Sequence, residues 1–304
     1  MSQLQLPVGM HVLERGWLSA NNILFIGREE TALVDSGYVT HAPQTLALVR
    51  HVLGTRTLDR LLNTHLHSDH CGGNALLQEA FQCRTAIPAA ETDKVARWDQ
   101  QALSYRATGQ QCPRFSFDET IADGALLQLG DLQWQALAAP GHDPHSLIFY
   151  CAQEGVLISA DALWQNGFGI IFPELEGESG FAEAQATLEL IAQLDVRLVI
   201  PGHGAPFDDV GAALQRAFSR LQYMQEDPLR NAQNGIKVLI KFLLLERQRI
   251  ALSELPAMLR EIPLLNAANR RFMQMDEESL AHWVTAQLER AGAARSDGEF
   301  LLDA

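Results

Sequence analysis

The segment THLHSDHCGG, residues 64–73, places three histidines and one aspartate within six positions. In an extended chain alternate side chains point the same way, so His65, His67 and Asp69 can share one face, with His70 at a neighbouring point. On a helix, His65 and His67 would diverge. Imidazole and carboxylate ligands together suit zinc, iron or manganese. The segment therefore predicts part of a metal site.

Further residues of metal-ligand type stand where apolar runs end. The run LLNTH ends at His65, LQWQALAAPGH at His142, GVLISAD at Asp161 and RLVIPGH at His203. Functional residues gather at strand ends in layered α/β folds, because the loops converge there. A lone histidine after a strand is more often an ordinary polar residue than a ligand. Four such runs combined with the 64–73 segment favour a shared metal centre.

The remaining pattern alternates short apolar runs with helical periodicity, which predicts a layered α/β sandwich. Helix 74–81 has Asn74 as its expected cap. We expect strands within 11–17, 21–27, 31–37, 61–65, 117–160 and 197–200, and helices at 42–53, 74–81, 91–103, 181–195 and 209–225.

The sequence pattern becomes mainly helical from about residue 229. DPLRNAQNG (227–235) resembles a linker, and helices are expected at 235–248, 253–261 and 277–291. The tail 292–304 is compatible with a hairpin that turns at Asp297-Gly298. We therefore predict two domains, a catalytic domain at 1–228 and a mainly helical, winged-helix-like extension at 229–304 that completes or caps the site.

Composition limits the function classes. The chain has 304 residues, 47% hydrophobic, and a net charge of −14. An acidic surface repels phosphate backbones, so we expect no nucleic-acid partner. No apolar run approaches a membrane span, and the N-terminus lacks a signal-peptide pattern. Four cysteines without a CxxC pair (Cys71, Cys83, Cys112 and Cys151) favour reduced thiols and a cytoplasmic protein.

HLHSDH resembles the HxHxDH signature of the metallo-β-lactamase-like superfamily, which includes glyoxalase II. VDSG (34–37), PGH (140–142), SAD (159–161) and PGHG (201–204) are similar to that family's other motifs and follow in the same order. The resemblance covers roughly residues 8–207. It implies a four-layer αββα sandwich with the active site at one edge of the sheets.

The resemblance also implies a ligand set for two divalent metal ions, with zinc expected first and iron or manganese as alternatives. One ion would take His65, His67 and His142. The other would take Asp69, His70 and His203, and Asp161 would bridge the two. Asp35, in the VDSG turn, would orient a ligand histidine. The alternative is that Asp35 only caps its turn.

The loop after the third histidine departs from the family pattern. Many relatives have GHTxG there, whereas this chain has GHDPHS, with Asp143 and His145. His145 is placed to reach a substrate or act as an acid, or it is an ordinary exposed loop residue. We could map no glutathione-recognition signature, which weakens an assignment to glutathione thioesters.

These residues predict a binuclear metal-dependent hydrolase that uses a metal-bridged hydroxide, with Asp69 as the catalytic residue that orients the nucleophile and carries its proton. The expected substrate is a small-molecule ester, thioester or lactone, and residues 162–175 either wall its pocket or pack against the sheet. Alternatives are a di-iron redox enzyme of the same fold, a phosphodiesterase, and a DNA-binding regulator. The last is disfavoured by the acidic helix 277–291. A homodimer is compatible with the sequence.

Overall fold

The computed structural model describes residues 5–304, and its main body contains two sheets. The first sheet has six strands in sequence order. Strands β1 to β3 are antiparallel, and β3 to β6 are parallel. The strands are β1 (Met10–Leu13), β2 (Asn22–Ile26), β3 (Thr31–Val34), β4 (Arg60–Leu62), β5 (Arg84–Pro88) and β6 (Glu119–Ile121).

The second sheet has five strands in the order β11-β10-β9-β8-β7. Only β10 and β11 pair in parallel, and the other neighbours are antiparallel. Its strands are β7 (Leu126–Leu129), β8 (Leu132–Ala138), β9 (Leu147–Cys151), β10 (Val156–Ala160) and β11 (Leu198–Pro201).

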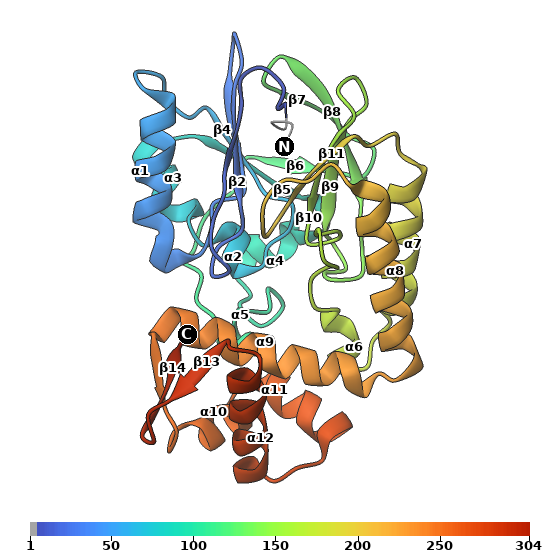
Figure 1. The fold of residues 1–304 in the computed structure, drawn as a ribbon. Coiled ribbons are helices and arrows are strands. Elements are labelled where there is room, and N and C mark those ends of the chain that lie inside the picture. The colour runs from blue at the N-terminus through green and yellow to red at the C-terminus, as the bar shows by residue number, and fades with distance from the viewer. Residues whose placement is uncertain (1–4) are drawn as a thin grey trace.

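Alternation of side chains along each strand builds four layers. Ile23 and Phe25 of β2 pack with Ile158 of β10 in the core between the sheets. Leu24 of β2 faces the other way, toward α1 (Ala42–Leu53) and α3 (Asn74–Phe81). Leu157 of β10 faces α7 (Phe181–Gln193) and α8 (Val210–Glu226). Figure 1 shows these helix pairs on opposite outer sides, which confirms the predicted αββα sandwich.

Residues after α8 form a mainly helical region below one edge of the sandwich (Figure 1). Its helices are α9 (Leu229–Arg247), α10 (Leu255–Glu261), α11 (Pro263–Ala268) and α12 (Glu277–Arg290). A small sheet of order β12-β14-β13 joins them, from Arg249–Ala251, Phe300–Asp303 and Ala294–Ser296. The helical extension and tail hairpin are confirmed. The winged-helix-like arrangement and the 1–228/229–304 division stay predictions.

Several local predictions differ from the structure. Residues 229–235 are the first turns of α9 rather than a linker. The helix expected at 91–103 is only α4 (Thr92–Arg97), because Trp98 adopts a left-handed conformation that ends it. Asn74 does not cap α3. Its side chain instead donates to Asn63 and accepts from Ser36, which ties α3 to the neighbouring loops.

Candidate metal centre

Strand ends position most of the predicted site. His65 follows β4, His142 follows β8, Asp161 follows β10 and His203 follows β11. These strands belong to both sheets, so the site lies where the two sheets meet at one edge. Asp35 follows β3 on the same edge. The sequence thus folds locally so that five loops deliver their polar side chains to one place.

The 64–73 segment is not extended throughout. The short helix α2 (Ser68–Cys71) begins directly after His67. The expectation that His65, His67 and Asp69 share one face is therefore wrong, because the backbone turns at Ser68. Asp69 and His70 both join a second group of side chains, as the family resemblance implied.

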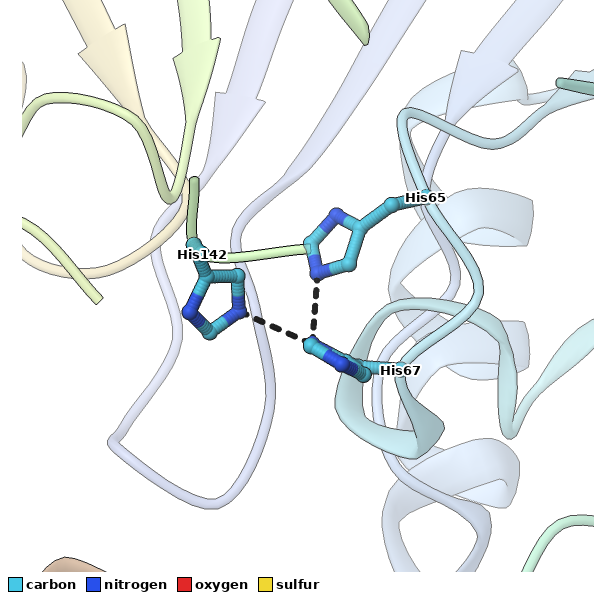
Figure 2. Close-up of side chains that lie close together, drawn as sticks. All are labelled: His65, His67 and His142. Carbon is cyan, nitrogen blue, oxygen red and sulfur yellow. Dashed lines mark hydrogen bonds between the residues drawn. The ribbon is translucent and has the colours of Figure 1, made fainter. Parts of the chain in front are cut away.

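The first group comprises three buried histidines, His65, His67 and His142. Nδ1 of His67 lies 2.8 Å from Nε2 of His142 and 3.1 Å from Nε2 of His65. Figure 2 shows the three rings turned toward one another, with His142 arriving from the other sheet. The backbone carbonyl of Ile170 accepts a hydrogen bond of 2.6 Å from Nδ1 of His142, which leaves Nε2 free to face the group.

The second group comprises Asp69, His70, Asp161 and His203. Nε2 of His203 lies 3.1 Å from Oδ2 of Asp69. Oδ2 of Asp161 lies 3.4 Å from Nε2 of His70 and 3.3 Å from Nε2 of His142. One carboxylate oxygen of Asp161 is thus within reach of both groups.

Asp35 holds the ring of His70. It is 2% exposed, and its Oδ2 accepts a hydrogen bond of 2.8 Å from Nδ1 of His70. The backbone N–H and hydroxyl of Thr64 donate to the same carboxylate at 2.9 and 2.8 Å. With a proton fixed on Nδ1, the neutral ring of His70 would present a bare Nε2 toward Asp161. Asp35 thus contacts a candidate ligand histidine directly, and its orienting role stays a prediction.

Burial and neighbouring carboxylates shift the histidine pKa values of the first group and that of His70 in opposite directions. Desolvation lowers the pKa of His67 and of His142 to about 4 each. It also holds the pKa of His65 well below its usual value, so this group is neutral near pH 7. Burial alone would lower the pKa of His70 too, but the Asp161 and Asp35 carboxylates outweigh it and raise that pKa.

The donor atoms present fit metal ions. Tetrahedral zinc, with Zn–N bonds of about 2.0–2.1 Å, would separate two ligand nitrogens by about 3.3 Å. The nitrogen separations of 2.8 and 3.1 Å among His65, His67 and His142 lie close to that value. In the second group, Nε2 of His70 is buried without a hydrogen-bond partner. A buried polar atom left so is costly unless something coordinates it.

A cavity of about 400 Å³ opens beside both groups. His67, Asp69, His142, Asp161 and His203 line one end. The 162–175 segment contributes Trp164, Phe168, Gly169, Ile170 and Phe172, which confirms that it walls the pocket. Helix α9 contributes Asn234, Val238, Leu239, Lys241, Phe242 and Leu245, so the C-terminal region completes the cavity.

His145 lies beside the site rather than among the residues that line this cavity. Its Nδ1 donates to Glu91, and Lys94 donates to the same carboxylate oxygen at 2.8 Å. Asp143 from the same loop reaches the centre instead, with Oδ2 3.6 Å from Nε2 of His67. A direct role for His145 on a substrate is therefore not supported by its position.

Sequence reasoning did not single out two tryptophans at the centre, although Trp164 lies in the 162–175 segment expected near the pocket. Trp164 donates from Nε1 to Oδ1 of Asp161 at 3.2 Å. Trp17 stacks on the ring of His203 with centroids 5.4 Å apart, although it is 60% exposed. Trp164 stands three positions after Asp161 of the SAD motif, and this proximity could have pointed to it. No local sequence feature pointed to Trp17.

Comparison with known proteins decides the family. The sequence profile described as "Metallo-beta-lactamase superfamily" matches residues 15–203, which span every proposed ligand. The chain belongs to this superfamily. Membership and the two His/Asp groups together identify it as an enzyme of the metal-dependent hydrolase class. No helix within residues 5–304 combines the length and apolar character needed to cross a membrane.

Curated superfamily relatives share modest identity. A hydroxyacylglutathione hydrolase of Mesorhizobium japonicum is 27% identical over 65% of this chain and 70% of its own length. One from Ectopseudomonas mendocina is 32% identical over 46% of this chain, which spans less than half of that relative.

Solved structures support the fold. A metallo-β-lactamase family protein of Thermus thermophilus aligns with a TM-score of 0.59, 22% identity, and coverage of 97% of this chain and 99% of its own. TTHA1623, in a di-iron-bound form, aligns with a TM-score of 0.55, 25% identity, and coverage of 68% and 98%. The first covers the C-terminal region as well as the sandwich.

Proposed function

We propose that the protein binds two divalent metal ions and hydrolyses a small-molecule ester, thioester or lactone. The observation that carries the proposal is the position of Asp161, whose Oδ2 lies 3.3 Å from His142 of one group and 3.4 Å from His70 of the other. A carboxylate shared in this way suits a bridging ligand. The relatives named hydroxyacylglutathione hydrolase favour thioesters within this class.

His65, His67 and His142 would hold one metal ion, and Asp69, His70 and His203 would hold the other, with Asp161 between them. Two metal ions so held would supply Lewis acidity and would lower the pKa of bound water toward neutrality. Asp69 lines the cavity and is the proposed residue that orients the attacking water and takes its proton. The apolar cavity walls exclude bulk water, which strengthens electrostatic interactions at the reacting carbonyl.

The native metal is proposed to be zinc, with iron as the alternative. Three histidines in one group and mixed histidine and carboxylate ligands in the other suit either ion. TTHA1623 has been solved in a di-iron-bound form, so a redox function is the alternative proposal for the present protein. Iron in the purified protein, with redox-dependent colour and no esterase activity, would favour that function. The homodimer and the cytoplasmic location stay predictions.

The test combines metal analysis with a substrate screen. We expect two metal ions per chain and activity toward thioesters, esters or lactones, with β-lactams and phosphodiesters as comparison substrates. The variant D69A should lose nearly all activity because it removes a ligand and the proposed proton carrier. The matched control D99N changes an exposed carboxylate outside the cavity and should behave as wild type. Activity undiminished in D69A contradicts the proposed mechanism.

A further inference from the structure

The cavity beside the metal centre carries a cation, Arg220, that forms no ion pair with a residue in the described part of the chain. Arg220, on α8, lines the cavity and lies with its Cζ 5.2 Å from the centre of the Phe168 ring. Among residues 5–304, no carboxylate oxygen lies within 4.0 Å of its guanidinium nitrogens. Burial lowers the pKa of Arg220, yet an arginine remains charged at any physiological pH. A half-buried cation without a partner is costly.

A second group on the wall also lacks a partner. The Nδ2 atom of Asn234, on α9, is buried without a hydrogen-bond partner in the described chain. Asn234 lines the same cavity as Arg220. The second cation that lines the cavity, Lys241 on α9, already has hydrogen-bond partners. It donates to the carboxylate of Asp303 and to the backbone oxygen of Ala293. Arg220 is thus a lining cation without an ion-pair partner among the described residues, and Asn234 adds an amide donor without a partner at the same wall.

Most of the remaining wall is apolar, although Thr108 and Gln110 also line it. Phe168, Ile170 and Phe172 contribute from one side, and Val238, Leu239 and Phe242 contribute from α9. The lining carboxylates, Asp69 and Asp161, belong to the metal centre. The cavity therefore offers a reactive end, an apolar body and a free guanidinium.

We propose that the substrate is an apolar acyl compound with one anionic terminus, whose carboxylate is bound by Arg220 and by the amide of Asn234. This inference rests on the proposed hydrolase function and narrows its substrate class. The guanidinium fork matches a carboxylate in two parallel hydrogen bonds, and the apolar walls favour a hydrocarbon body over a peptide. Arg220 is thus a specificity residue, and glutathione thioesters should be poorer substrates than apolar monoacids.

Two pairs of thioesters test the proposal on metal-loaded enzyme. The thiophenyl thioester of adipic acid is compared with that of adipamic acid, which replaces the free carboxylate by a carboxamide. The hexanoyl thioester of 4-mercaptobenzoic acid is compared with that of 4-mercaptobenzamide, and S-lactoylglutathione is the reference. We expect kcat/KM at least tenfold higher for the acid in at least one pair, and above that for S-lactoylglutathione.

The variant R220Q should abolish the preference, lowering kcat/KM for the acid to about that for the matching amide. R220K keeps the charge but not the planar guanidinium, so it should retain part of the preference for the acid. It also serves as a control for the case in which R220Q does not fold. The matched control R216Q removes an exposed guanidinium from the same helix, where Arg216 donates only to the backbone oxygen of Gln165. It should keep the full preference.

A binding arm separates this inference from the hydrolase proposal. Hexanesulfonate and hexyltrimethylammonium are titrated into the metal-loaded protein, with fluorescence of Trp17 and Trp164, which line the cavity, as the signal. The sulfonate should bind at least tenfold more tightly than the ammonium, and R220Q should remove the difference. Equal binding of hexanesulfonate and hexyltrimethylammonium overturns the inference. So does a difference in their affinities, or a kinetic preference for the acid substrate, that persists in R220Q. Absence of any turnover, with Arg220-dependent sulfonate binding, overturns only the hydrolase proposal.

Discussion

Replacing Asp35 by asparagine should weaken metal binding in one group and spare the other. Asn keeps the size of the side chain and tolerates the left-handed backbone, where Asp35 has φ of 59°. Its carbonyl can still accept from the backbone of Thr64. The amide nitrogen would face Nδ1 of His70, now 2.8 Å from the carboxylate oxygen, as donor against donor. His70 would then carry its proton on Nε2, the atom proposed to bind metal.

The magnitude follows from that tautomer change. Loss of such a supporting hydrogen bond typically lowers metal affinity by about 10–100-fold, which is about 1.4–2.8 kcal/mol. The loss should fall on the Asp69, His70 and His203 group. No hydrogen bond joins Asp35 directly to the three-histidine group. Nδ1 of His142 donates to the carbonyl of Ile170, and Nδ1 of His65 lies 3.2 Å from the Thr64 hydroxyl.

Chelator competition followed by metal analysis measures the two affinities separately. The control D59N alters a carboxylate with matching chemistry, since Asp59 accepts from the backbone and hydroxyl of Thr31 at 2.8 and 3.0 Å, remote from the site. We expect two wild-type affinities in D59N and one weakened affinity in D35N. Equal affinities in D35N and wild type, or an equal loss at both sites, would refute the orienting role of Asp35.

Two further substitutions test neighbouring parts of the centre. H145Q removes the hydrogen bond between His145 and Glu91. In the wild type this bond raises the pKa of His145. It also lowers the pKa of Glu91, although the burial of Glu91 acts in the opposite direction. The pair therefore stabilises the fold most between about pH 4.5 and 6.5, and its contribution is lost as pH rises through the raised pKa of His145. Urea unfolding should show a deficit of about 1 kcal/mol in H145Q at pH 6 that shrinks by pH 9, and a deficit that does not change with pH would contradict this. G169A should reduce metal loading severalfold, because a Cβ there would lie 2.8 Å from Cε1 of His142 and nearer still to Nδ1. G211A, where a Cβ meets open space, should load normally, and equal loading of the two variants would show that the ring has room to move.

Most of the site could be predicted because ligand types stood at strand ends, a relation that needs only periodicity and motif order. The start of α9 could not. Its first residues are polar and contain Gly235, a composition typical of a linker, yet Gly235 is buried in a packed contact. A Cβ there would lie 2.8 Å from Cδ1 of Leu175, so the absence of a side chain favours the close approach of α9 to α6 (Phe172–Glu176). Long-range packing of this kind leaves no local signal.

Backbone geometry at the strand ends helps to aim the candidate ligand side chains. Two non-glycine residues at strand ends have positive φ, Asp35 at 59° and Ala160 at 45°. Each such conformation costs about 1–3 kcal/mol unless surrounding structure imposes it. The Ala160 carbonyl accepts from Gly202 at 2.7 Å, which locks the two loops that carry Asp161 and His203 against each other. The buried sheets compensate for this strain, so the backbone contributes to the convergence of the two groups. Metal affinity should then depend on residues such as Asp35 and Gly169 that never touch the ion.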